Sequence, residues 1–180
     1  MHSEFEKNYF ALFGLPVRYS IDLPDLQIRY RELQKKFHPD KFASGSDAER
    51  RLASQMAAQI NAGYQTLKSP LARGRYLLQL AGLGLDDEKD TQMTPAFLME
   101  QMEMRENLDA AREDENTLAL LQGMIKTVEA ATNSRVSQLS DLFEESDDQE
   151  KLLVARNCLR EMQFLEKFRK DIEQAEDEYL

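Results

Sequence analysis

Apolar residues recur at three- and four-residue spacings along most of this 180-residue chain, and this period constrains the fold more than any other feature. Such spacing places the apolar side chains on one face of an α-helix. It occurs over residues 22–37 and 46–68, and again over roughly 95–113, 116–143 and 147–178. We find no strand pattern, internal repeat or low-complexity tract. The period therefore predicts an all-α protein.

Capping signals mark a short polar segment between the first two of these helices. Asp22 can cap the first helix, and His38 ends it, because a residue before Pro39 is disfavoured in the α region. Ser46 and Glu49 have the spacing of a capping box at the start of the second helix. Two helices joined by a loop of this length pack as an antiparallel hairpin, with the loop at its tip.

The loop begins with His38-Pro39-Asp40 in a basic setting. Composition alone places these three residues together in about one in a hundred chains of this length, so by itself the tripeptide indicates only a turn. Asp40 is a short carboxylate that can form a bidentate pair with an arginine of another protein. Lysines and arginines beside it supply a complementary field for an acidic surface. They are Arg29, Lys35, Lys36 and Lys41.

Charge and composition divide the chain in two. Residues 1–81 hold 12 Lys/Arg and 8 Asp/Glu for a net charge of +4, whereas residues 82–180 hold 11 and 25 for −14. A glycine-rich and then charged stretch over 82–94 reads as a linker, and Thr94-Pro95 is a suitable start for the next helix. Three helices with short connectors follow and predict an antiparallel bundle over residues 95–180. The opposite charges suggest two surfaces for two partners.

The helix that starts at Pro95 carries more apolar surface than a core requires. Its natural core face consists of Phe97, Met104, Leu108 and Ala111. A second stripe lies well away from that face and consists of Leu98, Met99 and Met102, with Glu103 and Glu106 beside it. Such a stripe suggests a partner-binding surface, and methionines adapt to a partner's contour. The alternative is that Leu98 and Met102 pack against the N-terminal part or a neighbouring helix.

Several segments resemble one protein family. Residues 8–15, 38–42 and 60–67 resemble, in this order, the opening helix, signature loop and third helix of J-domains. The resemblance implies an N-terminal J-domain over residues 1–81, a helical hairpin with flanking short helices. It also implies that His38-Pro39-Asp40 triggers ATP hydrolysis in a DnaK-type chaperone, with the four basic residues named above as the docking face.

Residues 70–78 and 95–101 resemble one branch of J-proteins, the HscB family of iron–sulfur cluster co-chaperones. This resemblance covers nearly the whole chain. It implies an HscA-type ATPase chaperone and the iron–sulfur scaffold protein IscU as partners. The scaffold-binding residues that it implies are Leu98, Met99, Met102, Glu103, Glu106 and, less directly, Phe164.

Other functional classes fit the sequence less well. The net charge of −10 argues against nucleic-acid binding, and no apolar run of 18 residues could span a membrane. The N-terminus lacks the features of a signal peptide, which favours the cytoplasm. One cysteine excludes an intramolecular disulfide and a zinc-finger site, and Cys158 is expected in the core.

We expect no catalysis by this chain, no cofactor and no metal site. His38 has only His2 as a fellow histidine, and no phosphate loop or Ser-His-Asp set is present. Two non-enzymatic alternatives remain. One is a J-protein for unfolded clients in general, although the chain has neither a Gly/Phe-rich stretch nor Cys-x-x-Cys repeats. The other is a scaffold that has lost chaperone activation.

Overall fold

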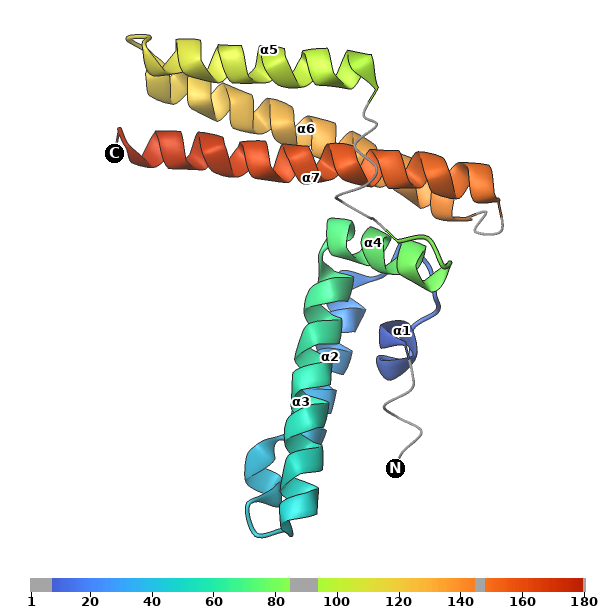
Figure 1. The fold of residues 1–180 in the computed structure, drawn as a ribbon. Coiled ribbons are helices and arrows are strands. Elements are labelled where there is room, and N and C mark those ends of the chain that lie inside the picture. The colour runs from blue at the N-terminus through green and yellow to red at the C-terminus, as the bar shows by residue number, and fades with distance from the viewer. Residues whose placement is uncertain (1–7, 85–93, 145–147, 180) are drawn as a thin grey trace. The chain divides into compact units, whose positions relative to one another are not determined.

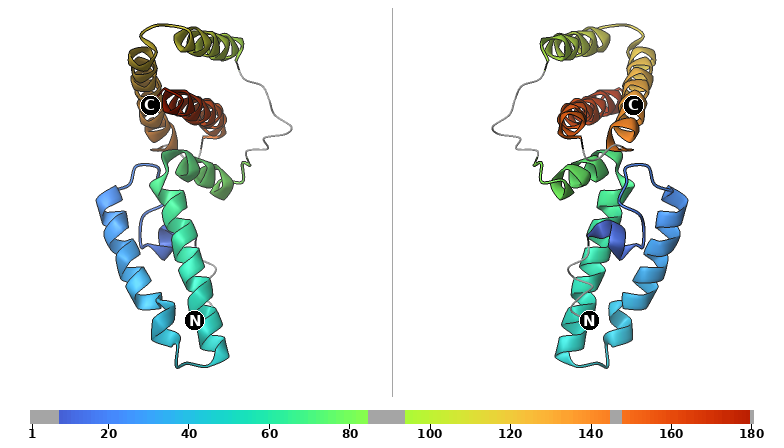
Figure 2. Two further views of the ribbon diagram at one scale, coloured as in Figure 1. Left: turned by 90° about the vertical axis from the view of Figure 1, so that its left-hand side faces the viewer. Right: turned by 90° about the vertical axis from the view of Figure 1, so that its right-hand side faces the viewer.

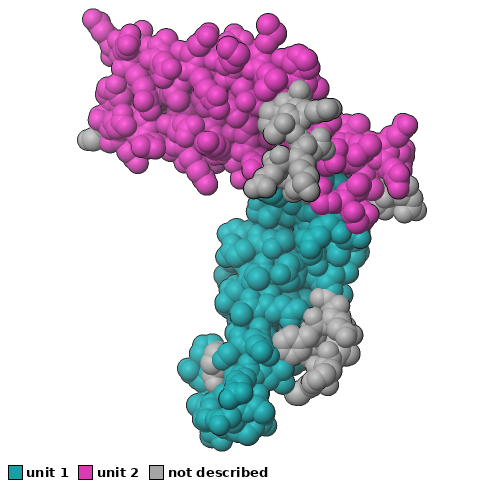
Figure 3. All heavy atoms as spheres, viewed as in Figure 1, with its two compact units in different colours: residues 1–80 teal, residues 81–180 magenta. Residues whose placement is uncertain are grey.

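A computed structural model describes residues 8–84, 94–144 and 148–179 of the chain. Every regular element within these ranges is helical, as the sequence predicts. The chain divides into two compact units, residues 1–80 and 81–180 (Figure 3). None of the described helices has both the length and the apolar character that a membrane span needs.

The first unit is built around the predicted hairpin (Figures 1 and 2). Helices α2 and α3 run antiparallel, and the short α1 packs against α3. The elements in order are α1 (Tyr9–Leu12), α2 (Leu23–Phe37), the 3₁₀ turn η2 (Pro39–Phe42), α3 (Asp47–Lys68) and α4 (Pro70–Leu80).

The predicted ends of α2 and the predicted start of α3 are confirmed. Side chains close to each end determine where the helix begins or stops. The Asp22 side chain accepts a hydrogen bond from the backbone N–H of Asp25 at 3.1 Å, which caps α2. His38 is extended, with ψ of 128°, and ends α2 before Pro39. At the start of α3 both halves of the Ser46–Glu49 capping box are present.

The tripeptide departs from the irregular loop that we expected, since Pro39–Phe42 forms one turn of 3₁₀ helix. Proline suits the first position of such a turn because its φ is already fixed and it has no N–H to satisfy. The His38 side chain caps the turn by accepting from the Asp40 N–H. The residues of the tripeptide therefore have a defined backbone.

The core of the first unit follows the predicted stripes. Its fully buried side chains include Leu26 of α2 and Met56, Ile60 and Leu67 of α3. Gly63 lets α1 approach α3 closely, because a Cβ there would lie 2.9 Å from Cδ1 of Tyr9. A side chain at this position would push the two helices apart.

Helix α4 is tied to the end of α3 by a buried arginine. The Arg73 guanidinium donates to the carbonyl of Leu67 at 2.6 Å, and its Cζ lies 4.9 Å from the ring centroid of Tyr19. Desolvation by burial lowers the pKa of Arg73 from its ordinary value. The sequence pattern gave no sign of this buried cation.

The second unit is an antiparallel three-helix bundle of α5 (Pro95–Arg112), α6 (Thr117–Glu144) and α7 (Gln149–Asp177) (Figure 1). Its helix bounds agree with the predicted ranges to within two residues. The core contains Phe97, Leu108, Ala111, Leu121, Val128, Phe164, Leu165, Phe168, Ile172 and Ala175. The predicted linker at 82–94 lies mostly outside the described residues.

Candidate functional site

The tip of the α2–α3 hairpin presents His38 and Asp40 to solvent. The Asp40 side chain is 89% exposed, and the backbone N–H of Asp40 donates to Nδ1 of His38 at 3.3 Å. The same Nδ1 lies 3.5 Å from Oδ2 of Asp40. The carboxylate is thus held near the imidazole by its own turn and remains open to a partner's cation.

A hollow beside the tripeptide is lined mainly by cationic side chains. Its volume is about 480 Å³, and it is lined by Arg31, Gln34, Lys35, His38 and Lys41. Three of these residues, Lys35, His38 and Lys41, were predicted to bind the chaperone. No carboxylate belongs to the lining, so the hollow favours an acidic partner segment.

Two lining residues, Arg31 and Gln34, were missing from the predicted docking face. Helical spacing places residues 31, 34 and 35 on one side of α2, but only the hollow that they line with His38 and Lys41 shows that this side lies beside the tripeptide. Gln34 is held by α3, since its Nε2 donates to the Tyr30 hydroxyl at 2.5 Å and that hydroxyl donates to Oδ1 of Asn61 at 2.9 Å. These hydrogen bonds connect a residue that lines the hollow to the contact between α2 and α3.

Arg29 and Lys36 do not line the hollow. The Arg29 Nε donates to Oδ2 of Asp25 at 2.8 Å, and its Nη1 donates to the carbonyls of Phe13 and Gly14 at 3.0 and 3.2 Å. This arginine therefore ties the end of α1 to α2. Lys36 Nζ lies 4.9 Å from the ring centroid of Phe37. Their assignment to the docking face has no support from this geometry and stays a prediction.

Helix α5 of the second unit leaves its second apolar stripe in solvent. Leu98, Met99 and Met102 are 46%, 74% and 61% exposed. Glu103 and Glu106 are exposed beside them. In contrast, Phe97 and Leu108 of the same helix are buried in the bundle core. The apolar residues outside that core form an open, acid-flanked surface.

Phe164 does not belong to this exposed surface. Its side chain is 9% exposed and lies in the bundle core. The ring makes an edge contact with Phe97 at 5.7 Å and stacks on Phe168 at 5.8 Å. The apolar stripe of α7 drifts around the helix, so spacing alone could not decide whether this ring faces in or out.

Cys158 is buried, as predicted. Its Sγ lies 3.7 Å from the carbonyl oxygen of Arg135. Burial, with a further contribution from Glu161, raises the pKa of the Cys158 thiol to about 11. A thiol with so high a pKa is a poor nucleophile and metal ligand at neutral pH, because the thiolate is the reactive form. Among the described residues there is no group of three or more His, Cys, Asp or Glu side chains placed to hold a metal ion.

Comparison with known proteins covers both units. A family model described as the HSCB C-terminal oligomerisation domain matches residues 93–173. The solved structure of the chaperone HscB from Vibrio cholerae is 40% identical, with a TM-score of 0.85, over 97% of this chain and 100% of that one. The chain belongs to the HscB family. The crystal structure of the human co-chaperone HscB is 30% identical, also with a TM-score of 0.85, over 94% of this chain and 82% of that one.

The HscB family consists of co-chaperones of iron–sulfur cluster assembly. Its members carry a J-domain, which in this chain is the first unit. Membership also implies a chaperone partner and a scaffold partner.

Proposed function

We propose that this protein stimulates ATP hydrolysis by an HscA-type chaperone and delivers an IscU-type scaffold protein to it. The observation that carries the proposal is the exposed apolar stripe on α5, in a chain whose J-domain also exposes His38 and Asp40. Single exposed apolar residues are common on protein surfaces, but Leu98, Met99 and Met102 lie within five residues of one helix and are all exposed.

On the J-domain, the hollow and the tripeptide have different tasks. Arg31, Lys35 and Lys41 attract an acidic surface of the chaperone and bring it into register. Asp40 then pairs with a cation of that chaperone, and His38 holds the turn that presents it. The bond that breaks is in ATP bound to the partner, so this chain acts as an activator.

On the bundle, the scaffold contacts Leu98, Met99 and Met102, and Glu103 and Glu106 select basic residues at the rim of its surface. Because both partners bind one polypeptide, the second encounter is effectively intramolecular and occurs at a raised local concentration. The scaffold's iron–sulfur cluster is cargo in this scheme.

The test measures steady-state ATP hydrolysis by an HscA-type chaperone with this chain alone, with the scaffold alone and with both. We expect the chain alone to stimulate hydrolysis, and the pair to exceed the sum of the separate effects. No stimulation by the chain alone would refute the activator role. A merely additive result for the pair would refute delivery.

A calorimetric titration separates this proposal from a J-protein for unfolded clients. Folded scaffold protein and a permanently unfolded polypeptide are titrated into the full chain in parallel. We expect saturable binding of the folded scaffold and much weaker binding of the unfolded chain. The opposite preference would favour the general J-protein.

A further inference from the structure

The four residues that link the 3₁₀ turn to α3 have no apolar anchor of their own. They are Ala43, Ser44, Gly45 and Ser46, all small, and only Gly45 is partly buried. A segment of this kind loses little by moving, because it buries almost no surface. It nevertheless connects directly to the turn that presents Asp40, so its order matters for the trigger.

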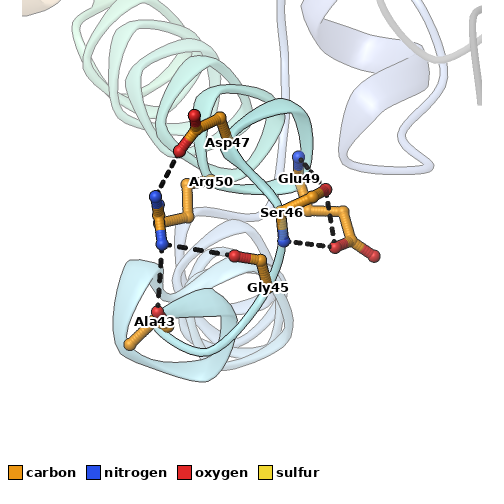
Figure 4. A network of polar contacts seen from close by, with 6 residues as sticks. All are labelled: Ala43, Gly45, Ser46, Asp47, Glu49 and Arg50. Carbon is orange, nitrogen blue, oxygen red and sulfur yellow. Dashed lines mark hydrogen bonds and ion pairs between the residues drawn. The ribbon is translucent and has the colours of Figure 1, made fainter.

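One side chain of α3 reaches back over this segment (Figure 4). Arg50 Nη1 donates to the carbonyls of Gly45 at 3.2 Å and Ala43 at 3.4 Å. The other terminal nitrogen of its guanidinium forms an ion pair with the Asp47 carboxylate, which fixes the guanidinium plane. One planar group therefore holds both the segment and the first turn of α3.

The hydrogen bonds continue from this guanidinium to the trigger residue. The carbonyl of Asp40 accepts from the N–H of Ala43 at 3.3 Å, and the carbonyl of Ala43 accepts from Arg50. Ala43 is also the residue that ends the 3₁₀ turn. The backbone of Asp40 is thus linked through one residue, Ala43, to a side chain of α3.

The neighbouring capping box does not supply the same restraint. The Ser46 hydroxyl accepts from the N–H of Glu49, and the Glu49 carboxylate accepts from the N–H of Ser46 at 2.8 Å. Both bonds lie within the start of α3 (Figure 4). They fix where the helix begins, whereas the Arg50 bonds cross to the residues that precede it.

A surface ion pair alone would be a weak reason to single out Arg50. Exposed pairs contribute little, and Arg50 and Asp47 are both largely exposed. The distinguishing feature is the geometry of the donors, because two nitrogens of one rigid, planar guanidinium bind two carbonyls and a carboxylate that lie apart from one another. A lysine would keep the charge and lose that arrangement.

We propose that Arg50 is a positioning residue for the His38-Pro39-Asp40 trigger, holding the 3₁₀ turn against α3 so that Asp40 meets its partner in a fixed orientation. This inference rests on the proposed activation of an HscA-type ATPase. We call the contacts of Arg50 with Ala43, Gly45 and Asp47 the clamp. The docking cations of α2 lie outside the clamp, so loss of Arg50 changes the stimulation of the ATPase more than the affinity for the chaperone. Small misplacements of a group that must pair in one geometry are costly even when binding survives.

The experiment compares three variants of the full chain: Arg50→Gln, Arg50→Lys and Arg51→Gln. The last removes an equal charge from the next residue of α3 and is the matched control. Chaperone ATPase rate is measured against concentration of the chain, which gives a maximal stimulation and a half-saturating concentration. We expect both Arg50 variants to lower the maximal stimulation about fivefold, the equivalent of one hydrogen bond, with little change in half-saturation. Arg51→Gln should leave the maximum unchanged.

Two results in this assay would overturn the inference. Wild-type behaviour of Arg50→Lys would show that charge suffices. Equal shifts of half-saturation in Arg50→Gln and Arg51→Gln, with an unchanged maximum, would show that Arg50 is only part of the docking field.

Amide hydrogen exchange on the same variants is independent of the partner. Faster exchange confined to residues 41–46 in the Arg50 variants is the expected result. Unchanged exchange there, or faster exchange throughout α2 and α3, would refute the clamp. If the wild-type chain failed to stimulate any ATPase, the proposed function would fall, and the exchange measurement would still decide whether Arg50 holds the turn.

Discussion

The J-domain tip and the exposed face of α5 are the two partner surfaces that we propose, and they are built in opposite ways. The tip uses polar groups on a short turn whose backbone is fixed by Pro39, by the His38 cap and by contacts to α3. The face of α5 uses Leu98, Met99 and Met102 on a regular helix, where the backbone needs no special feature. One surface depends on the orientation of a charge, and the other on apolar area left out of a core.

This difference determines how each surface tolerates change. A charge in water gains little from a nearby partner unless the geometry is close to ideal, so the tip is sensitive to small displacements. Apolar contact is roughly proportional to area, so the helix face loses affinity in steps as side chains are changed. Partner binding at the J-domain tip should therefore depend on the orientation of a charged group, and binding at α5 on the amount of apolar surface.

The largest effect that we expect is a loss of stability when a side chain of the bundle core is removed. Phe164→Ala should destabilise the protein by about 3–5 kcal/mol, because it removes a buried ring that touches two others. Chemical denaturation followed by circular dichroism measures this loss. Met99→Ala serves as the exposed control and should change stability little. A stable Phe164→Ala protein with weakened scaffold binding would place this ring on the partner surface after all.

Asp40→Asn should abolish most ATPase stimulation while the fold is unchanged. The side chain is exposed, so its loss costs the native state almost nothing. Loss of a charged partner from a desolvated pair costs about 2–5 kcal/mol, or about thirtyfold or more in the stimulated rate. Stimulation assays and thermal melts of both proteins test this. Glu32→Gln removes a carboxylate from α2 as a control, and equal loss there would argue against a specific trigger.

Met102→Glu should weaken binding of the folded scaffold about tenfold, because it places a charge where the partner needs apolar contact. ATPase stimulation by the chain alone should persist, since the J-domain is untouched. Met104→Glu is the contrasting variant, because Met104 packs against the bundle core and its change should reduce stability first. Calorimetric titration and denaturation distinguish the two. Parallel loss of binding and stimulation in Met102→Glu would indicate a folding defect.

The smallest effect concerns the capping box beside the trigger turn. Hydrogen bonds from the backbone and then the hydroxyl of Ser46 lower the pKa of Glu49 from its ordinary value. A carboxylate with a lowered folded-state pKa stabilises the protein above its unfolded pKa, and this contribution is lost as pH falls through the folded value. Denaturation of wild type and Glu49→Gln between neutral and acidic pH should show a small difference that vanishes in acid. A difference that grows in acid would contradict this assignment.

Much of the fold was predictable because helix ends and helical faces are local properties. Asp22, Ser46 and Thr94 cap the helices that the sequence assigned to them. The second stripe on α5 was also visible, because its side chains lie far from the core face of the same helix. Capping, and the side of the helix on which a residue lies, depend on neighbours within one or two turns.

Other features depended on contacts between distant segments and could not be read from periodicity. Arg29 looked like part of a basic face, but its donors are used by carbonyls at the end of α1. Arg31 and Gln34 join the hollow because α2 ends beside the 3₁₀ turn. Arg73 is buried under Tyr19, which no local pattern indicates. In each case the partner comes from another element.

The sequence by itself determined that the chain is all-helical and where its principal helices begin and end, and it singled out the tripeptide and the apolar stripe that we propose as partner surfaces. These follow from the three- and four-residue period and from capping chemistry, which act within a few residues. Only the tertiary structure decided which cations surround the tripeptide, that Phe164 lies in the core, and that Arg50 spans the segment behind the trigger. Those outcomes depend on how separate helices meet, and side-chain direction at such contacts is fixed by packing.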